Sequence, residues 1–275
     1  EQSTHFKDRT ILAQVISQIR ARHKMSYDEL AKLMISTLGE YFNEEFQHQA
    51  TRFQGQVSEL IRPRFLVALS GGIDSAVVTA LATRAVGIEH ILPVTMPHND
   101  GDQECLDMAG LLRDFLGFSA PGTGQIPYVI NISRMLFEYQ NSLADYGEQL
   151  SLVYTIPPSR ERLMRLGNMA SRIRTAILYD LQRGIRGRIL GTENRPEYCQ
   201  GYGTKFGTPM SCDFGVLNEL YKTDIYGLAE ALGLPEEVRK QAPSSGFWPG
   251  QTHAEELGAS LDEQDALSFL LFERN

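Results

Sequence analysis

The chain reads FLVALSGGIDSAVVTALATRAV from Phe65 to Val86, a stretch that combines a short strand, a glycine turn and a helix. Residues 65–69 form an apolar run with a β-branched member, which is typical of a strand buried on both faces of a parallel sheet. Residues 75–86 are rich in Ala and Val and precede Gly87, a pattern that predicts a helix and its C-terminal end. The stretch therefore indicates an α/β fold.

The turn between this strand and helix reads SGGIDS from Ser70 to Ser75. Its two adjacent glycines lack the Cβ atoms that would hold an anion away, and their N–H groups lie at the start of a helix. The turn therefore predicts a phosphate site, with an unliganded glycine turn as the alternative. The spacing and the lysine of a Walker A loop are missing. The hexapeptide instead resembles the pyrophosphatase loop of ligases that cleave ATP between its α- and β-phosphates.

Composition narrows the classes of function. The 275 residues carry a formal net charge of -8, which disfavours a nucleic-acid partner because such proteins usually present a basic face. The three cysteines form no C-x-x-C pair, so a disulfide framework or a zinc ribbon is disfavoured and a reducing compartment is favoured. No apolar run reaches the roughly 18 residues of a membrane helix, and no signal sequence is evident. We therefore expect a cytoplasmic protein without a membrane partner.

The length favours one domain over two. We expect a single unit over residues 1–275, in which residues 1–61 form a helical elaboration and residues 62–275 form the α/β core. A first helix is predicted by an apolar stripe at helical spacing, Ile11, Leu12, Val15, Ile16 and Ile19. These extra N-terminal helices should pack on the chain's own core or, alternatively, at a subunit interface.

A second helix is predicted to begin at Ser26, because Ser26-x-x-Glu29 has the form of a capping box. Residues 43–64 are expected to form a further, polar helix. The second helix places on one face Leu30, Leu33, Met34, Thr37, Leu38, Tyr41 and Phe42.

Strands and helices alternate after the glycine turn. Strands are predicted at 91–95, 128–132 and 186–190, and helices at 102–115, after Ser133 as N-cap, and at 161–182, with a connection over 141–159. This order implies βαβ units and a doubly wound parallel sheet with helices on both faces. Ligands of such sheets bind at the carboxyl ends of the strands. The loops at 70–75, at 96–99 and after Gly191 should therefore share one crevice.

Six motifs occur in a fixed order: SGGIDS (70–75), GNMASRIR (167–174), GTENRPE (191–197), GYGTKFG (201–207), LYKTD (220–224) and PSSGFWPGQTHAEELG (243–258). Together they resemble the NAD⁺ synthetase family, ligases that amidate nicotinic acid adenine dinucleotide. The resemblance extends from about residue 65 to about residue 270. It implies an adenine-nucleotide α-hydrolase-like fold and an ammonia-dependent ligase activity.

The resemblance also implies the roles of individual residues. Asp74 and Glu197 would hold Mg²⁺, which prefers oxygen ligands and keeps several waters. Asp74, Lys222 and Asp213 would be catalytic. The deamido-NAD substrate would bind Arg172, Lys205 and Asp213. The residues expected to bind ATP are Ala68, Leu69, Ser70, Gly71, Gly72, Ile73, Asp74, Ser75, Thr192, Lys222 and Ser244.

These residues also have plainer interpretations. Asp74 could only complement the dipole of the helix that it begins. Glu197, Lys205 and Lys222 could be surface residues. The loop at 242–253 has the composition of a lid that could exclude water over the substrate.

The reaction implied by the resemblance has two steps. The nicotinate carboxylate attacks the α-phosphorus of ATP to give an adenylate and pyrophosphate, and ammonia then attacks the activated carbonyl to give NAD⁺ and AMP. Such chemistry requires mainly positioning and charge stabilisation from the protein. The chain is too short to hold a glutaminase as well, so ammonia would come from solution or from a separate amidotransferase. The cofactor would be Mg²⁺, ATP would be a co-substrate, and a homodimer is expected.

Three features depart from the family pattern. Thr208 follows GYGTKFG where an acidic residue is usual, His253 stands where an aspartate is common, and the chain ends at Asn275 before a basic segment. Two alternatives are therefore considered. One is another pyrophosphatase-loop enzyme, such as a GMP synthetase-like ligase or a tRNA-modifying enzyme, and the other is a nucleotide-binding paralogue without catalysis. The presence of both Asp74 and Glu197 favours catalysis, because a binding protein has little need of two metal ligands.

Overall fold

A parallel sheet of five strands lies at the centre of the residues that the computed structural model describes, which are 9–53, 63–98, 103–119, 128–144, 160–208, 210–244 and 250–273. The strand order is β3-β2-β1-β4-β5, and each neighbouring pair is parallel. The strands are β1 (Phe65–Ala68), β2 (Ile91–Thr95), β3 (Tyr128–Val129), β4 (Arg188–Gly191) and β5 (Phe214–Gly215). The doubly wound fold predicted from the sequence is confirmed.

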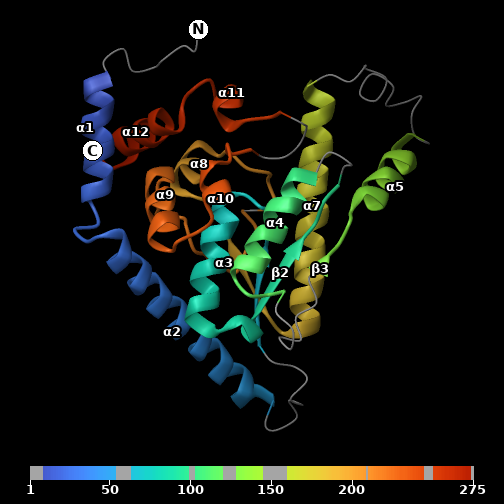
Figure 1. Cartoon of the computed structure of the whole chain (residues 1–275). Coiled ribbons are helices and arrows are strands. Elements are labelled where there is room, and N and C mark those ends of the chain that lie inside the picture. Colours follow the sequence, from blue (N-terminus) through green and yellow to red (C-terminus); the bar gives the residue numbers. More distant parts are fainter. Residues whose placement is uncertain are drawn as a thin grey trace.

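Helices cover both faces of this sheet (Figure 1). One apolar layer packs α2, α3, α4 and α9 against one face, and a second layer packs α5 and α7 against the other. The long helices are α1 (Arg9–Ala21), α2 (Tyr27–Phe53), α3 (Ile73–Val86), α4 (Gln103–Phe115), α5 (Ser133–Ala144), α7 (Arg160–Ile185), α9 (Lys222–Ala231) and α12 (Leu261–Phe272). The short ones are η1 (Ile88–His90), α8 (Arg195–Gln200), α10 (Glu236–Lys240) and α11 (His253–Leu257).

The apolar character of β1 follows from its central position between these two layers. Phe65 and Val67 point into the layer formed with α3, whereas Leu66 points into the layer formed with α7. All three side chains are almost fully buried. A strand covered on both faces carries no alternation of apolar and polar residues, which explains the continuous apolar run.

The N-terminal helices pack on the chain's own core. Val15, Ile16 and Ile19 of α1 contact α9 and α12 through a small apolar cluster, and α1 lies beside α12 in Figure 1. The predicted capping box of α2 is present, since the backbone N–H of Ser26 donates to Glu29 Oε2 over 2.8 Å. The expected apolar stripes are incomplete: Ile11 and Leu33 are about half exposed.

Several predicted boundaries were wrong. β3 ends at Val129, and the helix α2 continues through Phe53 without a break, while residues 54–62 lie outside the described part of the chain. The predicted connection from residue 141 is helical up to Ala144, and residues 145–159 lie outside the description. Ser133 is the first residue of α5, and its hydroxyl donates to the carbonyl of His98 over 2.7 Å, a contact between elements that local sequence does not reveal.

The sheet reverses its winding direction between β1 and β4. From β1 the chain adds β2 and β3 on one side, and it then returns to add β4 and β5 on the other side. A parallel sheet opens a crevice at the carboxyl ends of its strands at such a point. The loops that leave β1 and β4 carry the SGGIDS and GTENRPE motifs, so both motifs lie at this switch point. Within the described ranges, no helix combines the length and the apolar character needed to span a membrane.

Candidate active site

The glycine turn after β1 has a conformation that other residues would not tolerate. Gly71 has a φ of 88°, and a Cβ atom placed on it would lie 2.8 Å from the carbonyl oxygen of Cys105 on α4. Gly72 occupies the N-cap position of α3 without a side-chain cap. The N-terminal end of α3 therefore faces the switch point with backbone N–H groups that no capping side chain covers, which is the arrangement that binds phosphate.

The two serines of the turn fix its shape. The Ser75 hydroxyl donates to the carbonyl of Gly72 over 2.9 Å, and it accepts the backbone N–H of Ser70 at 3.3 Å. The Ser70 hydroxyl accepts the backbone N–H of Gly72 at 3.3 Å. These bonds fix the conformation of the turn. Just before it, Leu69 continues the ladder of β1 by donating its N–H to the carbonyl of Val94 over 2.9 Å.

Asp74 joins three elements at the switch point. Its Oδ2 accepts the ammonium of Lys222 from α9 at 2.5 Å, and its Oδ1 accepts the side-chain amide of Asn194 from the loop after β4 at 3.1 Å. Lys222 is only 3% exposed. The loops at 70–75 and after Gly191 therefore lie side by side, as predicted from the sequence. Of the third loop, Asn99 lies outside the described residues, and the carbonyl of Met96 accepts the Arg174 side chain from α7 at 2.9 Å.

Asn194 organises both acidic residues of the site. Besides binding Asp74, its side-chain oxygen accepts the backbone N–H of Glu197 at 3.1 Å, and Glu197 Oε2 accepts the backbone N–H of Asn194 at 3.2 Å. This capping box begins α8 and fixes the carboxylate of Glu197. We did not single out Asn194 from the sequence. The Asn-x-x-Glu spacing in GTENRPE is a signal that could have revealed its capping role.

Burial sets the electrostatics of this group. Burial raises the pKa of Glu197 to about 7, with Lys222 opposing the shift and Asp74 adding to it. Burial alone would lower the pKa of Lys222, but the carboxylates of Asp74 and Glu197 outweigh it and raise the pKa, so the ammonium stays charged. Two acids and one lysine at a helix N-terminus thus form a compact charged site.

The position of Lys222 depends on Asp265 of α12. Asp265 accepts the backbone N–H of Lys222 at 3.1 Å, and it accepts both the N–H and the hydroxyl of Thr223 at 2.7 Å. An acid on one helix therefore occupies the N-terminus of another. Burial raises the pKa of Asp265 to about 6, although these hydrogen bonds lower it. We did not predict this support from the sequence.

His253 lies beside Glu197. Its Nδ1 is 3.9 Å from Glu197 Oε1, and its ring meets the edge of the Tyr202 ring with 4.8 Å between the centroids. Burial, with a further contribution from Lys222, lowers the pKa of His253 to about 4, so the imidazole is neutral near pH 7. His253 thus places an uncharged ring beside Glu197. His253 also begins α11 and donates its N–H to the carbonyl of Pro243 over 3.0 Å.

Residues 204–208 are held against α7. Thr204 donates its hydroxyl to the side-chain oxygen of Asn168 over 2.6 Å, and Ser171 donates its hydroxyl to the carbonyl of Thr208 over 2.7 Å. Arg172 Nε donates to the carbonyl of Lys205 over 3.1 Å. The structure therefore brings Arg172 of α7 close to Lys205 of the segment 204–208, and both side chains are exposed.

Asp213 lies elsewhere. Its Oδ2 accepts the backbone N–H of Ile189 at 2.7 Å and the side-chain amide of Gln182 at 2.5 Å. Ile189 precedes Thr192 by three residues, which is about 10 Å along a strand. The structure thus does not bring Asp213 to Asp74 and Lys222. The motif match alone could not show that Asp213 accepts a hydrogen bond from the backbone near the start of β4.

The remaining predicted residues have the following positions in the fold. Ala68 ends β1, Ile73 is the first residue of α3 and is buried, and Thr192 is the first residue after β4. Ser244 is exposed, and residues 245–249 of the predicted lid lie outside the described residues.

The residues fit a magnesium ion that is shared with phosphates. Asn194 fixes the carboxylates of Asp74 and Glu197 at one edge of the sheet, and the raised pKa of Glu197 shows that extra positive charge would be favourable there. In the described part of the chain, no cluster of three or more His, Cys, Asp or Glu side chains could hold a metal by itself. Mg²⁺ is usually bound by one or two carboxylates, waters and substrate phosphates, so two carboxylates suffice.

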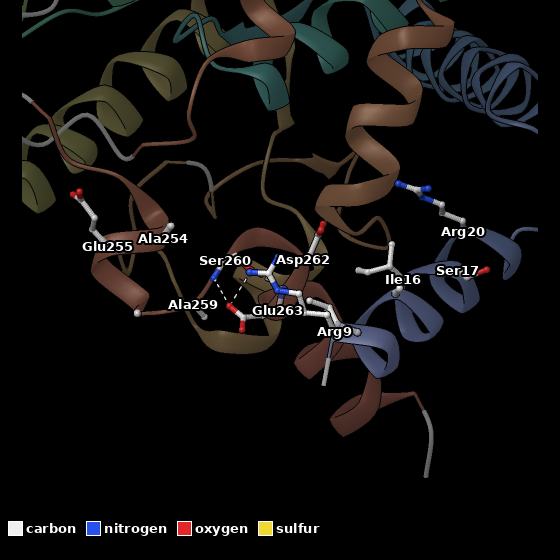
Figure 2. A pocket seen from close by; sticks show the side chains of 13 residues that line it. Arg9, Ile16, Ser17, Arg20, Ala254, Glu255, Ala259, Ser260, Asp262 and Glu263 are labelled. Atoms are coloured by element: carbon white, nitrogen blue, oxygen red, sulfur yellow. Dashed lines mark hydrogen bonds between the residues drawn. The ribbon is translucent and has the colours of Figure 1, made fainter. Parts of the chain in front are cut away.

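A separate pocket lies between α1, α11 and the start of α12. Its volume is about 780 Å³, and it is formed between α1 and the residues that join α11 to α12 (Figure 2). Figure 2 shows Arg9 and Arg20 of α1 on one wall and the capping box of Ser260 and Glu263 on another. None of the predicted site residues lines this pocket.

Comparison with known proteins identifies the family. The family model described as NAD synthase matches residues 45–275. An NH(3)-dependent NAD(+) synthetase from Chlorobaculum tepidum is 36% identical over 208 residues, which cover 76% of this chain and 67% of the relative. An NH3-dependent NAD synthetase structure from Campylobacter jejuni aligns with a TM-score of 0.58 and 28% identity, covering 78% of this chain and 77% of that chain. An NMN synthetase structure from Francisella tularensis aligns with a TM-score of 0.68 and 25% identity, covering 88% and 86%. With its phosphate turn, paired acids and buried lysine at the switch point, the chain belongs to the NAD synthase family.

Proposed function

We propose that the chain catalyses the ATP-dependent amidation of nicotinic acid adenine dinucleotide to NAD⁺, with ammonia as the nitrogen source and AMP and pyrophosphate as the other products. The observation that carries the proposal is the contact of Asp74 with both Lys222 and Asn194 at the switch point of an NAD synthase fold. Relatives that share about a third of the sequence are named NH(3)-dependent NAD(+) synthetases. In this proposal, both the adenylation and the amidation take place at the switch point.

ATP would bind with its phosphates over the N-terminus of α3. The glycine turn supports this placement, because the hydrogen bonds of Ser70 and Ser75 fix its shape at the N-terminus of α3, where phosphate can bind the backbone N–H groups. Lys222 would neutralise charge that develops on the departing pyrophosphate. The proposal also places around ATP the residues Ala68, Leu69, Ile73, Thr192 and Ser244.

Magnesium would be held by Asp74 and Glu197. When bound, the ion neutralises the negative charge that develops on the pyrophosphate leaving group. Asn194 would keep the two carboxylates aligned, and Lys222 would exchange its contact with Asp74 for one with the phosphates. The buried state of Glu197 supports this assignment, because an acid whose pKa is raised by burial gains most from a nearby cation.

The acceptor would lie along residues 204–208. Arg172 and Lys205 are positioned there by α7 and provide two positive charges for the phosphates of a dinucleotide. The proposal keeps Asp213 as a catalytic residue that also contacts the acceptor; its side chain is exposed, and its Oδ2 accepts the backbone N–H of Ile189 and the side-chain amide of Gln182. The acceptor carboxylate would then attack the α-phosphorus from this side, and ammonia would displace AMP from the resulting adenylate.

A coupled assay tests the proposal directly. Purified protein is incubated with ATP, Mg²⁺ and nicotinic acid adenine dinucleotide, and AMP and NAD⁺ are measured together with ammonium chloride or glutamine. We expect equal amounts of AMP and NAD⁺ with ammonium, and no product from the Asp74→Ala variant. The matched control is Asp114→Ala, which removes an exposed acid on α4. Failure of the unmodified protein to form either product would contradict the proposal.

A second acceptor deserves the same assay. The structure from Francisella tularensis that aligns over 88% of this chain is an NMN synthetase. The alternative is therefore that the chain amidates nicotinic acid mononucleotide. Competition between the two acceptors at equal concentration, followed by the ratio of NMN to NAD⁺, decides between them. An excess of NMN would replace the dinucleotide in our proposal while leaving the adenylation and amidation steps unchanged.

The proposal also includes the domain organisation and the oligomeric state of the protein. We propose a single domain in which residues 1–61 elaborate a core of 62–275, because α1 packs on α12 and α2 packs on α3 and α9. We further propose a homodimer that receives ammonia from solution or from a separate amidotransferase. The three free cysteines fit a reducing, cytoplasmic compartment. Sedimentation that shows a monomer at micromolar concentration would contradict the homodimer.

A further inference from the structure

Glu193 is a buried acid to which the reaction described above gives no task. The residue is 5% exposed, and its Oε1 has no hydrogen-bond partner among the described residues. Burial raises the pKa of its carboxyl group. Buried polar atoms are nearly always paired in folded proteins, and an unpaired one is costly. A carboxylate kept in this state therefore indicates a ligand with hydrogen-bond donors.

The position of Glu193 lies between the ATP side and the acceptor side of the site. The next residue, Asn194, contacts Asp74 and hence the phosphate turn. On the other side, Glu193 Oε1 faces Gly203, because a Cβ atom placed on Gly203 would lie 3.5 Å from it. Gly203 precedes Lys205 by two residues. The carboxylate is thus located where an acceptor activated by ATP must meet its nucleophile.

The described side chains around Glu193 offer it no strong hydrogen-bond donor, so the nucleophile of the second step is its best partner. Glu193 is close enough to Cys212 for its charge to help raise the pKa of the thiol, after burial and Asp213. A Cβ atom on Gly203 would also lie 2.7 Å from Met210 Sδ. A thioether donates no hydrogen bond and a thiol is a weak donor. Ammonium is a small cation with four N–H donors, so it satisfies a buried carboxylate in both charge and hydrogen bonding.

We propose that Glu193 binds the ammonium ion and acts as the general base that converts it to ammonia for the second step of the reaction. This inference rests on the proposed function. One N–H proton of ammonium moves to the Glu193 carboxylate and leaves an electron pair on nitrogen. That pair forms the C–N bond at the acyl carbon of the adenylate, and the bond between this carbon and the phosphate oxygen breaks, so AMP departs with its electrons. The amide nitrogen releases its surplus proton to water, and Glu193 returns its own proton to water before the next turnover.

The test separates the two half-reactions in the Glu193→Gln variant. Adenylation is followed by the exchange of labelled pyrophosphate into ATP in the presence of acceptor, and amidation is followed by NAD⁺ formation with ammonium chloride. Hydroxylamine, a nucleophile that is uncharged near neutral pH, traps the adenylate as a hydroxamate without needing a base. We expect unchanged exchange and unchanged hydroxamate formation, but a loss of about 10²- to 10⁴-fold in kcat/KM for ammonium. The loss should shrink as the pH rises, because solution then supplies ammonia already deprotonated.

Controls distinguish this role from a structural one. Glu138→Gln changes an exposed glutamate on α5 and should leave all three rates unchanged. Thermal unfolding of Glu193→Gln should show no loss of stability, since a neutral amide replaces a buried acid. Glu193→Asp retains a carboxylate and should recover part of the ammonium-dependent rate. If Glu193→Gln fails to fold, Glu193→Asp is judged by its ratio of ammonium to hydroxylamine activity, which should be lower than that of the unmodified protein.

Several outcomes would overturn the inference. Unchanged ammonium-dependent NAD⁺ formation in Glu193→Gln would do so. An equal loss of exchange, hydroxamate and amide formation would do so as well, because it would show a structural role. A ratio of ammonium to hydroxylamine activity in Glu193→Asp that equals the ratio in the unmodified protein would also overturn the inference. By contrast, unmodified protein that exchanges pyrophosphate but forms no NAD⁺ with ammonium would count against the proposed function itself.

Discussion

Single residues connect the parts of this site that lie far apart in sequence. Asn194 caps α8 through Glu197, and it also contacts Asp74, which is 120 positions earlier. The cap follows from an Asn-x-x-Glu pattern that any reader of the sequence can find. The contact with Asp74 depends on the neighbouring positions of β1 and β4 in the sheet, and no local pattern specifies it. Local capping is therefore predictable, whereas its link to the phosphate turn required the fold.

Removal of the Asn194 side chain should weaken magnesium-dependent catalysis. In Asn194→Ala, the carboxylates of Asp74 and Glu197 lose their shared partner, so we expect a drop of about 10- to 100-fold in apparent magnesium affinity or in activity. Loss of the cap should also cost about 1 kcal/mol of stability. The measurement is pyrophosphate release as a function of magnesium concentration.

The matched control for Asn194 is Ser26→Ala, which removes the cap of α2 far from the site. It should lose a similar amount of stability without any change in the magnesium dependence. If both variants respond to magnesium in the same way, Asn194 acts only through the stability of α8.

At the scale of helices, α12 positions α9, the helix that begins with Lys222. The LYKTD motif singled out Lys222, and the structure buries its ammonium against Asp74. The support for α9 comes from Asp265, which is 43 positions after Lys222. Nothing in the α12 sequence distinguishes Asp265 from the exposed Asp262 or from Glu263 of the capping box. Its role is determined by packing.

Asp265→Ala should therefore impair both stability and adenylation. Three donors at the N-terminus of α9 lose their acceptor, and a buried donor left unsatisfied costs about 1–3 kcal/mol. A small displacement of Lys222 should lower the rate of pyrophosphate exchange by roughly 10- to 100-fold. Gln264→Ala is the control, because Gln264 is also buried on α12 and its side-chain amide donates to the carbonyl of Ala259. A variant of Asp265 that exchanges pyrophosphate as fast as the Gln264 variant would refute this coupling.

The same residue should make stability depend on pH. The pKa of Asp265 is about 6 in the folded protein and 3.8 in its ordinary state, so the folded protein binds this proton more tightly. Protonation therefore favours folding, and this contribution is lost as the pH rises from about 4 to about 6. We expect the unfolding free energy of the unmodified protein, relative to Asp265→Ala, to fall by up to about 3 kcal/mol over this range. Urea denaturation at several pH values measures it, and a difference that is constant with pH would exclude Asp265 as the source.

Over the whole molecule, the N-terminal helices pack against α9, the helix that begins with Lys222. Asp224 of α9 is fully buried and accepts Arg22 Nη2 at 2.9 Å and the Tyr27 hydroxyl at 3.1 Å. The turn between α1 and α2 is thus attached to the helix that begins with Lys222. The sequence predicted both N-terminal helices and their apolar stripes. It left open whether those stripes meet the chain's own core or a second subunit, because an amphipathic pattern does not identify its partner.

The contact between α2 and α9 gives a sharp test of this organisation. A Cβ atom on Gly227 of α9 would lie 2.2 Å from the Tyr27 ring, so Gly227→Ala should force the helices apart and cost about 1–3 kcal/mol. Gly184 of α7 has no atom within 4 Å of its added Cβ, and Gly184→Ala should instead stabilise the protein by about 0.5–1 kcal/mol through helix propensity. Both substitutions replace Gly with Ala within a helix. Chemical denaturation therefore measures how the same added methyl group changes the unfolding free energy at a closely packed position and at an open one. A gain of stability in both variants would mean that α2 does not pack against α9, and residues 1–61 would then not belong to the same folding unit as the catalytic core.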